Sequence, residues 1–257
     1  MFTQTILILS MALIPVLLLI IYINRKDKMS PEPVGQLIRA FLLGLLSAPL
    51  SFAVSVPSEI LGLYSHDVAT VADAIRISFF GAAIPEEAAK LFILWIVVRR
   101  NKYFDEKMDG IVYAACVSMG FAAFENVLYL FGDVDNYMST GISRAMTSLP
   151  AHLCFGIIMG YYYSLAKFER RRRLVNSIMT FIAPVVAHGI YDSILFATTA
   201  LTVYISIESE EAAAIIGLIL MMIFIYFCIK MWKSAHRKIK EHIERDKSDI
   251  FKRNKFE

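Results

Sequence analysis

The sequence contains few cysteines and no segment typical of a soluble domain. Cys116, Cys154 and Cys228 are its three cysteines, and all lie within apolar runs, without the spacing of a metal site. We expect each of them to pack in a hydrophobic core. The sequence also lacks internal repeats and low-complexity stretches. The missing repeat argues against many transporter folds, which are built from repeated units.

Charged residues are scarce and are confined to short stretches between long apolar runs. They make up 19% of the 257 residues, whereas 57% are hydrophobic. This pattern predicts an all-α polytopic membrane protein with about seven transmembrane helices. We expect residues 1–232 to form a single membrane domain, with the motif-bearing core at about 77–197, and residues 233–257 to form a basic cytoplasmic tail. The predicted spans are 5–23, 37–57, 77–98, 110–131, 145–166, 174–197 and 212–231.

The positions of Lys and Arg predict the orientation. If the N-terminus is outside, all of the 26 basic residues except Arg76, Lys90 and Arg144 lie on the inner side, so we predict N-out and C-in. The net charge of +3 follows from this sidedness and does not indicate nucleic-acid binding. The first span has no basic residue before its apolar run and no cleavage site, so we expect a retained helix.

Five ionisable side chains lie inside four consecutive spans. They are Glu86, Glu87, Glu125, His152 and His188. A charged residue at the bilayer centre costs roughly 2.5–3.5 kcal/mol, so the fold must offset this cost. Counting residues from the cytoplasmic end of each span places Glu86, Glu125, His152 and His188, one on each span, roughly 20–22 Å deep in a core about 30 Å thick. The sequence therefore predicts one polar cavity in the outer half of the membrane.

Local spacing supports a site on the third span. Lys90 follows Glu86 by four residues and Glu87 by three, so its ammonium can lie against either carboxylate. Pro85 leaves the carbonyl of Gly81 without its usual helical partner, which predicts a kink or a helix start before the pair.

Two further polar residues lie next to the fourth-span and sixth-span groups. Asn126 follows Glu125 and is suited to orienting a carboxylate or a substrate amide. Asp192 follows His188 by four residues, a spacing at which a carboxylate can fix the imidazole tautomer. We therefore add Lys90, Asn126 and Asp192 as supporting residues.

Within residues 78–196, this set of motifs resembles the PrsW family of bacterial intramembrane proteases, which is related to the type II CAAX prenyl endopeptidases. Lys90 and Asn126 stand where the prenyl endopeptidases carry Arg and His, which favours the PrsW branch. The motifs are Glu86-Glu87-x-x-Lys90, Phe121-x-x-x-Glu125-Asn126, the His152 segment and His188-x-x-x-Asp192.

The resemblance implies a peptidase of the bacterial cytoplasmic membrane. Its substrate would be a single-span membrane protein, such as an anti-sigma factor, cut at site 1 near the extracytoplasmic side during a stress response. The expected partners are this substrate and the lipid bilayer, without nucleic acid.

Two mechanisms and one other function remain open from the sequence. In the favoured, glutamic-type mechanism Glu86 or Glu87 acts as the general base on a water held with Glu125, and His152 and His188 stabilise the oxyanion and protonate the leaving amine, without a cofactor. The same five side chains could bind Zn²⁺, although no His-Glu-x-x-His sequence is present. The alternative function is a proton- or ion-coupled transporter that uses the buried Glu, His and Lys residues as a relay.

Overall fold

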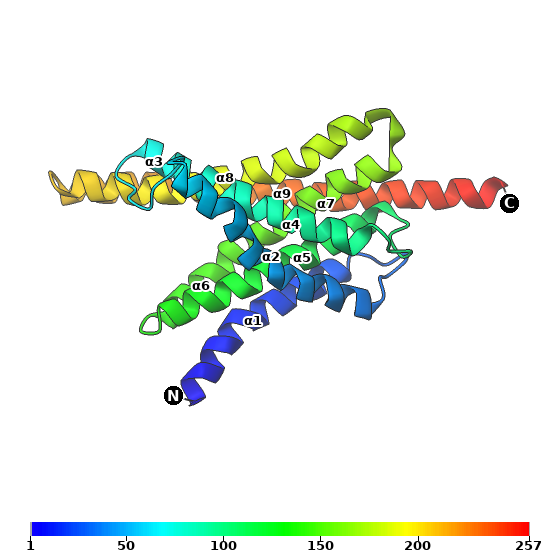
Figure 1. The fold of residues 1–257 in the computed structure, drawn as a ribbon, viewed down its shortest axis with the longest axis horizontal. Helices are drawn as coiled ribbons and strands as arrows, with labels where there is room; N and C mark the ends of the chain where they lie inside the picture. Colours follow the sequence, from blue (N-terminus) through cyan, green and yellow to red (C-terminus); the bar gives the residue numbers. More distant parts are fainter. Residues whose placement is uncertain (1, 257) are drawn as a thin grey trace.

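The computed structural model describes residues 2–256, and the described chain is helical apart from short connections (Figure 1). The predicted all-α class is confirmed. Between the α-helices lie a π-helical segment, η1, and a short 3-10 turn, η2. In chain order the elements are α1 (Phe2–Asn24), α2 (Val34–Ile60), α3 (Val71–Arg76), η1 (Ile77–Ala83), α4 (Ile84–Val98), α5 (Lys107–Gly132), α6 (Tyr137–Met146), α7 (Ser148–Phe168), η2 (Arg170–Arg172), α8 (Arg173–Ser206) and α9 (Glu210–Phe256).

Six helical stretches of the described chain are long and apolar enough to cross a membrane. They are α1, α2, α5, the α6–α7 pair, η2 with α8, and α9. The predicted third span, 77–98, corresponds to η1 and α4, which together carry three charged residues, Glu86, Glu87 and Lys90. The protein is therefore a multi-pass membrane protein with six to seven long apolar helices.

Helix α5 forms the centre of the bundle. In its most apolar stretch 78% of the residues are buried, compared with 11% in that of α9. Close approach of its neighbours depends on glycine: a Cβ atom at Gly120 would lie 2.2 Å from the carbonyl oxygen of Phe41 in α2. A Cβ atom at Gly160 in α7 would lie 2.2 Å from the carbonyl oxygen of Gly110. Small residues thus allow α2 and α7 to pack directly on the α5 backbone.

Two interruptions of helical geometry lie next to the ionisable residues. The π-helical segment η1 ends immediately before α4, and Pro85 lies in the first turn of α4, so the helix type changes just before Glu86 while the backbone stays helical. The predicted fifth span, 145–166, corresponds to α7, and a separate short helix, α6, precedes it and ends at Met146. Helix α6 lies beside the end of α5 and contacts α1, α5 and α7 (Figure 1).

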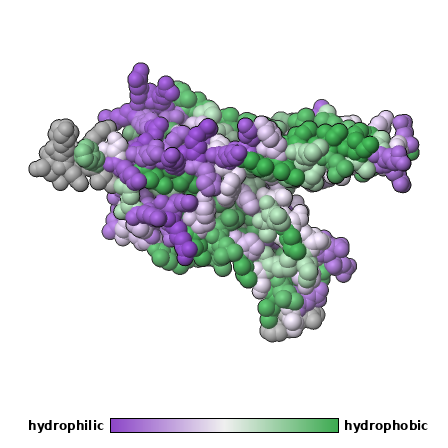
Figure 2. Space-filling view, turned by 180° about the vertical axis from the view of Figure 1, so that it is seen from behind, coloured by the Kyte–Doolittle hydropathy of each residue, from purple (hydrophilic) through white to green (hydrophobic). Residues whose placement is uncertain are grey.

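The surface separates apolar arms from a hydrophilic end. Figure 2 shows mainly hydrophobic residues along the projecting arm formed by α8 and α9, whereas hydrophilic residues gather at the other end of the molecule, on the side of the C-terminus. This is the end to which the distribution of Lys and Arg assigns the cytoplasm.

The second half of α9, which includes the predicted tail, packs under the bundle. Asp246 accepts hydrogen bonds from the backbone N–H groups of Lys107 and Met108, at 3.0 and 2.9 Å, and so caps the start of α5. The His242 ring stacks on Tyr161 of α7 with ring centroids 4.4 Å apart. The C-terminal helix is therefore tied to the inner ends of α5 and α7.

Candidate active site

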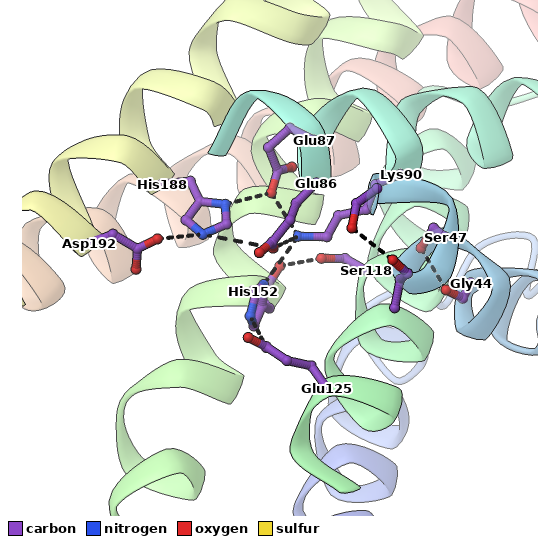
Figure 3. Close-up of polar contacts among 12 residues, drawn as sticks. Gly44, Ser47, Glu86, Glu87, Lys90, Ser118, Glu125, His152, His188 and Asp192 are labelled. Atoms are coloured by element: carbon purple, nitrogen blue, oxygen red, sulfur yellow. Dashed lines mark hydrogen bonds and ion pairs between the residues drawn. The ribbon is translucent and has the colours of Figure 1, made fainter. Parts of the chain in front are cut away.

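Helices α4, α5, α7 and α8 each contribute ionisable side chains to one network (Figure 3). The structure brings together all five residues predicted to form the centre, as well as Lys90 and Asp192. Their contacts require that the four groups lie at one level of the bundle, as the residue count from the span ends predicts. The network is built by helices of alternating direction, so no single local motif could define it.

The ammonium of Lys90 is the hub of this network. Its Nζ atom lies 2.8 Å from Glu87 Oε1, 3.4 Å from Glu86 Oε2 and 3.2 Å from His152 Nδ1. The same atom lies 4.0 Å from the centroid of the Phe121 ring. Because Lys90 is only 1% exposed, these contacts replace water around a fully buried charge.

The Lys90 contact also determines the tautomer of His152. An ammonium only donates hydrogen bonds, so Nδ1 of His152 is the acceptor and Nε2 carries the proton. Nε2 then donates to Glu125 Oε2 at 2.9 Å. The hydroxyl of Ser118 donates to the backbone carbonyl of His152 at 2.6 Å, which fixes α7 against α5 at this level.

His188 lies between two carboxylates. Its Nδ1 is 3.0 Å from Glu87 Oε1, and its Nε2 is 3.1 Å from Asp192 Oδ2. The ring stacks on Phe155 of α7, with centroids 4.6 Å apart and 15° between the planes. The stacking on Phe155 and the two nitrogen contacts therefore fix the orientation of the His188 ring. Asp192 makes the i,i+4 contact that its spacing predicts.

Arg144 belongs to the network and was missed from the sequence, which predicts it as one of the few basic residues outside. It projects from α6, where a guanidinium nitrogen lies 2.9 Å from Glu125 Oε2 and Nε lies 2.7 Å from Asn126 Oδ1. Its guanidinium also lies 4.0 Å from the centroid of the Tyr129 ring. Asn126 in turn donates to the carbonyl of Ala12 in α1 at 3.0 Å, so it positions Arg144 and α1.

A cavity of about 360 Å³ opens beside the network. Its lining includes Glu86, Glu125, His152, His188 and Asp192, but not Glu87 or Lys90. The side chain of Glu86 is 15% exposed, whereas that of Glu87 is 0% exposed. The two adjacent carboxylates therefore differ in access: Glu86 faces the cavity and Glu87 lies behind it.

Part of this donor set also suits a metal ion. Glu86, Glu87 and His152 each offer one ligand atom, and these atoms lie within 4.8 Å of one another. The second oxygen of Glu87, Oε2, is buried and has no hydrogen-bond partner within the described chain. Carboxylate and imidazole donors fit Zn²⁺, but the Lys90 ammonium contacts the same three side chains.

Comparison with known proteins identifies the family. A family model described as PrsW family intramembrane metalloprotease matches residues 32–229. The chain belongs to the PrsW family. The match extends well beyond the four motifs and includes all of α2 and α8 and the first part of α9.

Individual PrsW proteins align over most of the chain. Protease PrsW of Clostridioides difficile (strain 630) is 33% identical over 94% of this chain and 93% of its own length. The proteins of the same name from Oceanobacillus iheyensis and Bacillus subtilis (strain 168) are 37% and 36% identical over 77% and 74% of this chain and 87% and 83% of their own lengths. No solved structure matches the chain. The chain is therefore an intramembrane protease, as the motif resemblance implies.

The buried charges predict a specific pattern of stability. Replacing Lys90 with Met leaves Glu87 buried without its cation, and loss of one partner of a buried pair costs about 3–5 kcal/mol. We expect Lys90→Met to lower the thermal stability of the purified protein strongly, and the double change Lys90→Met with Glu87→Gln to restore much of it. Thermal unfolding in one detergent measures both variants. Equal stability of Lys90→Met and the unchanged protein would contradict the hub assignment.

Proposed function

We propose that this PrsW family member hydrolyses a peptide bond of a single-span membrane protein near the extracytoplasmic side of the bacterial cytoplasmic membrane. The observation that carries the proposal is the cavity lined by Glu86, Glu125, His152 and His188, a combination suited to activating water and stabilising an oxyanion. The predicted depth of these residues supports a cut near the outer boundary. An anti-sigma factor cut at site 1 in a stress response is the substrate that the family resemblance suggests.

In the proposed reaction Glu86 is the general base. It faces the cavity, so it can contact a water molecule that Glu87 cannot reach. Glu125 lies across the same cavity and can hold that water. His152 and His188 then stabilise the oxyanion, and one of them protonates the leaving amine.

Glu87 and Lys90 act as positioning residues in this scheme. Glu87 Oε1 contacts both Lys90 Nζ and His188 Nδ1, so it sets the relative position of α4 and α8. Lys90 contacts Glu86 and His152 and thereby fixes two groups that line the cavity. Asp192 orients His188 from the other side of its ring.

Substitution of each glutamate tests these roles. We expect Glu86→Gln to lower the rate of substrate cleavage by about 10²–10⁴-fold because the amide cannot accept a proton from water. We expect Glu87→Gln to abolish cleavage as well, through loss of the contacts to Lys90 and His188. The measurement is cleavage of a co-expressed tagged anti-sigma factor at matched protein levels, with Glu59→Gln in the exposed outer segment as control. Full activity of both Glu86→Gln and Glu87→Gln would overturn the proposal.

A metal ion would use the same residues. Glu86, Glu87 and His152 would hold Zn²⁺, and the ion would supply Lewis acidity and an activated water. The Lys90 ammonium would have to leave its contacts with these three side chains for the ion to bind. We propose the metal-free, glutamic-type mechanism because this ammonium already neutralises the carboxylates at that point.

Metal removal distinguishes the two mechanisms. We expect the purified protein to cleave its substrate at the same rate before and after treatment with a strong zinc chelator, and to contain less than one zinc per chain by elemental analysis. A soluble zinc protease treated in parallel shows that the chelator works. Loss of activity that returns only with added Zn²⁺, together with one zinc per chain, would assign the metal-dependent mechanism instead.

A further inference from the structure

A second and larger cavity lies between α4, α7 and α8, away from the ionisable network. Its volume is about 850 Å³. Its walls include Leu91, Phe92 and Trp95 of α4, Tyr163 of α7 and Phe181 of α8. Phe92 is 50% exposed and Trp95 is 44% exposed, so the groove is open along the outer surface of the bundle. In a membrane that surface meets lipid.

Four cations surround one end of this groove. Arg99 ends α4, Lys167 lies in the last turn of α7, Arg170 lies in η2 and Arg173 begins α8. No acidic residue lines the groove, and no ion pair joins any of the four to an acidic residue in the described part of the chain. Lys167 donates to the backbone carbonyl of Phe104, and the Arg99 guanidinium lies 4.6 Å from the centroid of the Trp95 ring. We refer to Arg99, Lys167, Arg170 and Arg173 as the basic rim.

We propose that this groove binds an anionic phospholipid, with its acyl chain between α4 and α8 and its phosphate at the basic rim. The apolar walls match a hydrocarbon chain, and the rim supplies the positive charge that an anionic headgroup requires. The rim lies at the end of the bundle that the charge distribution assigns to the cytoplasm, so the lipid comes from the inner leaflet.

Charge complementarity favours a lipid over the transmembrane helix of a substrate. The cytoplasmic flank of a single-span protein is usually rich in Lys and Arg, which the basic rim would repel. A lipid phosphate has the opposite charge and is attracted. A soluble phosphate would use the rim but would leave the apolar walls without a partner.

The bound lipid would contact the helix that carries the Glu pair. Ala88 and Leu91 line the groove, and they directly follow Glu87 and Lys90 in the sequence of α4. The lipid therefore supports α4 from the side opposite the cavity of the proposed active site. This inference rests on the groove alone and does not depend on the proposed proteolytic mechanism.

Fluorescence quenching at Trp95 tests the proposal in the full-length protein. The chain has two tryptophans, so Trp232→Phe leaves Trp95 as the only one. The protein is reconstituted in phosphatidylcholine vesicles that contain a small fraction of brominated phosphatidylglycerol or brominated phosphatidylcholine. We expect the anionic lipid to associate with the groove at least about tenfold more strongly, since each basic residue contributes about 1 kcal/mol of attraction. Equal quenching by the two lipids would overturn the proposal.

Charge variants separate the rim from general surface charge. We expect Arg99→Gln with Arg173→Gln to lower the preference for the anionic lipid about tenfold or more. Arg171→Gln with Arg172→Gln removes two charges from the same arginine run outside this groove, and we expect the preference to remain. An equal loss in both pairs would contradict a defined site.

Competition experiments distinguish the lipid from other occupants of the groove. Relief of quenching by soluble glycerol phosphate would indicate an anion site only, and relief by a substrate's transmembrane peptide would indicate a substrate site. If the rim pair fails to fold, the comparison of the two lipids in the Trp232→Phe protein still decides.

Discussion

The buried ammonium of Lys90 is the interaction on which the site depends. Four carboxylates, Glu86, Glu87, Glu125 and Asp192, lie within one layer of a bundle that crosses an apolar medium, and their mutual repulsion would otherwise be severe. Lys90 contacts two of them and one imidazole, while Arg144 contacts a third. These two cations therefore offset the repulsion between the carboxylates and link them through ion pairs and hydrogen bonds. Such a network requires that α4, α5, α7 and α8 keep fixed positions relative to one another along the bundle axis.

The backbone is adapted to these fixed helix positions. Helices α2 and α7 approach α5 so closely that a side chain at Gly120 or Gly160 would collide with a backbone carbonyl group. Glu86 and Glu87 follow the π-helical η1 and Pro85 in the first turn of α4, where Glu86 faces the cavity and Glu87 faces the interior. Fixed helix spacing and the change from π- to α-helical geometry together determine that Glu86, and not Glu87, lines the cavity.

Sequence patterns predict the parts of the site that depend on depth and local spacing. Residue counts from the span ends place Glu86, Glu125, His152 and His188 at one level, and the i,i+4 spacing predicts the His188–Asp192 contact. Both statements use only helix geometry, so no tertiary information is needed.

Other parts depend on packing between distant segments and could not be predicted in this way. Arg144 reaches the network from α6, a short helix that precedes α7, and its contact with Glu125 joins residues 19 positions apart on two helices. Phe155 of α7 stacks on His188 of α8, and a sequence pattern cannot predict this contact between two helices. The sequence predicts a basic cytoplasmic tail at 233–257, but it does not indicate that Asp246 caps the start of α5 or that His242 stacks on Tyr161 of α7.

The central claim is that the layer around Lys90 is a hydrolytic site that acts near the outer membrane boundary. It is tested most directly by comparing all protein N-termini in membranes of cells that contain the unchanged protein or the Glu86→Gln variant at equal levels. The account predicts new N-termini near the extracytoplasmic ends of single-span proteins, present only with the unchanged protein. Identical N-termini in the two samples, together with solute uptake driven by a pH gradient only in the unchanged protein, would contradict the account and indicate a transporter.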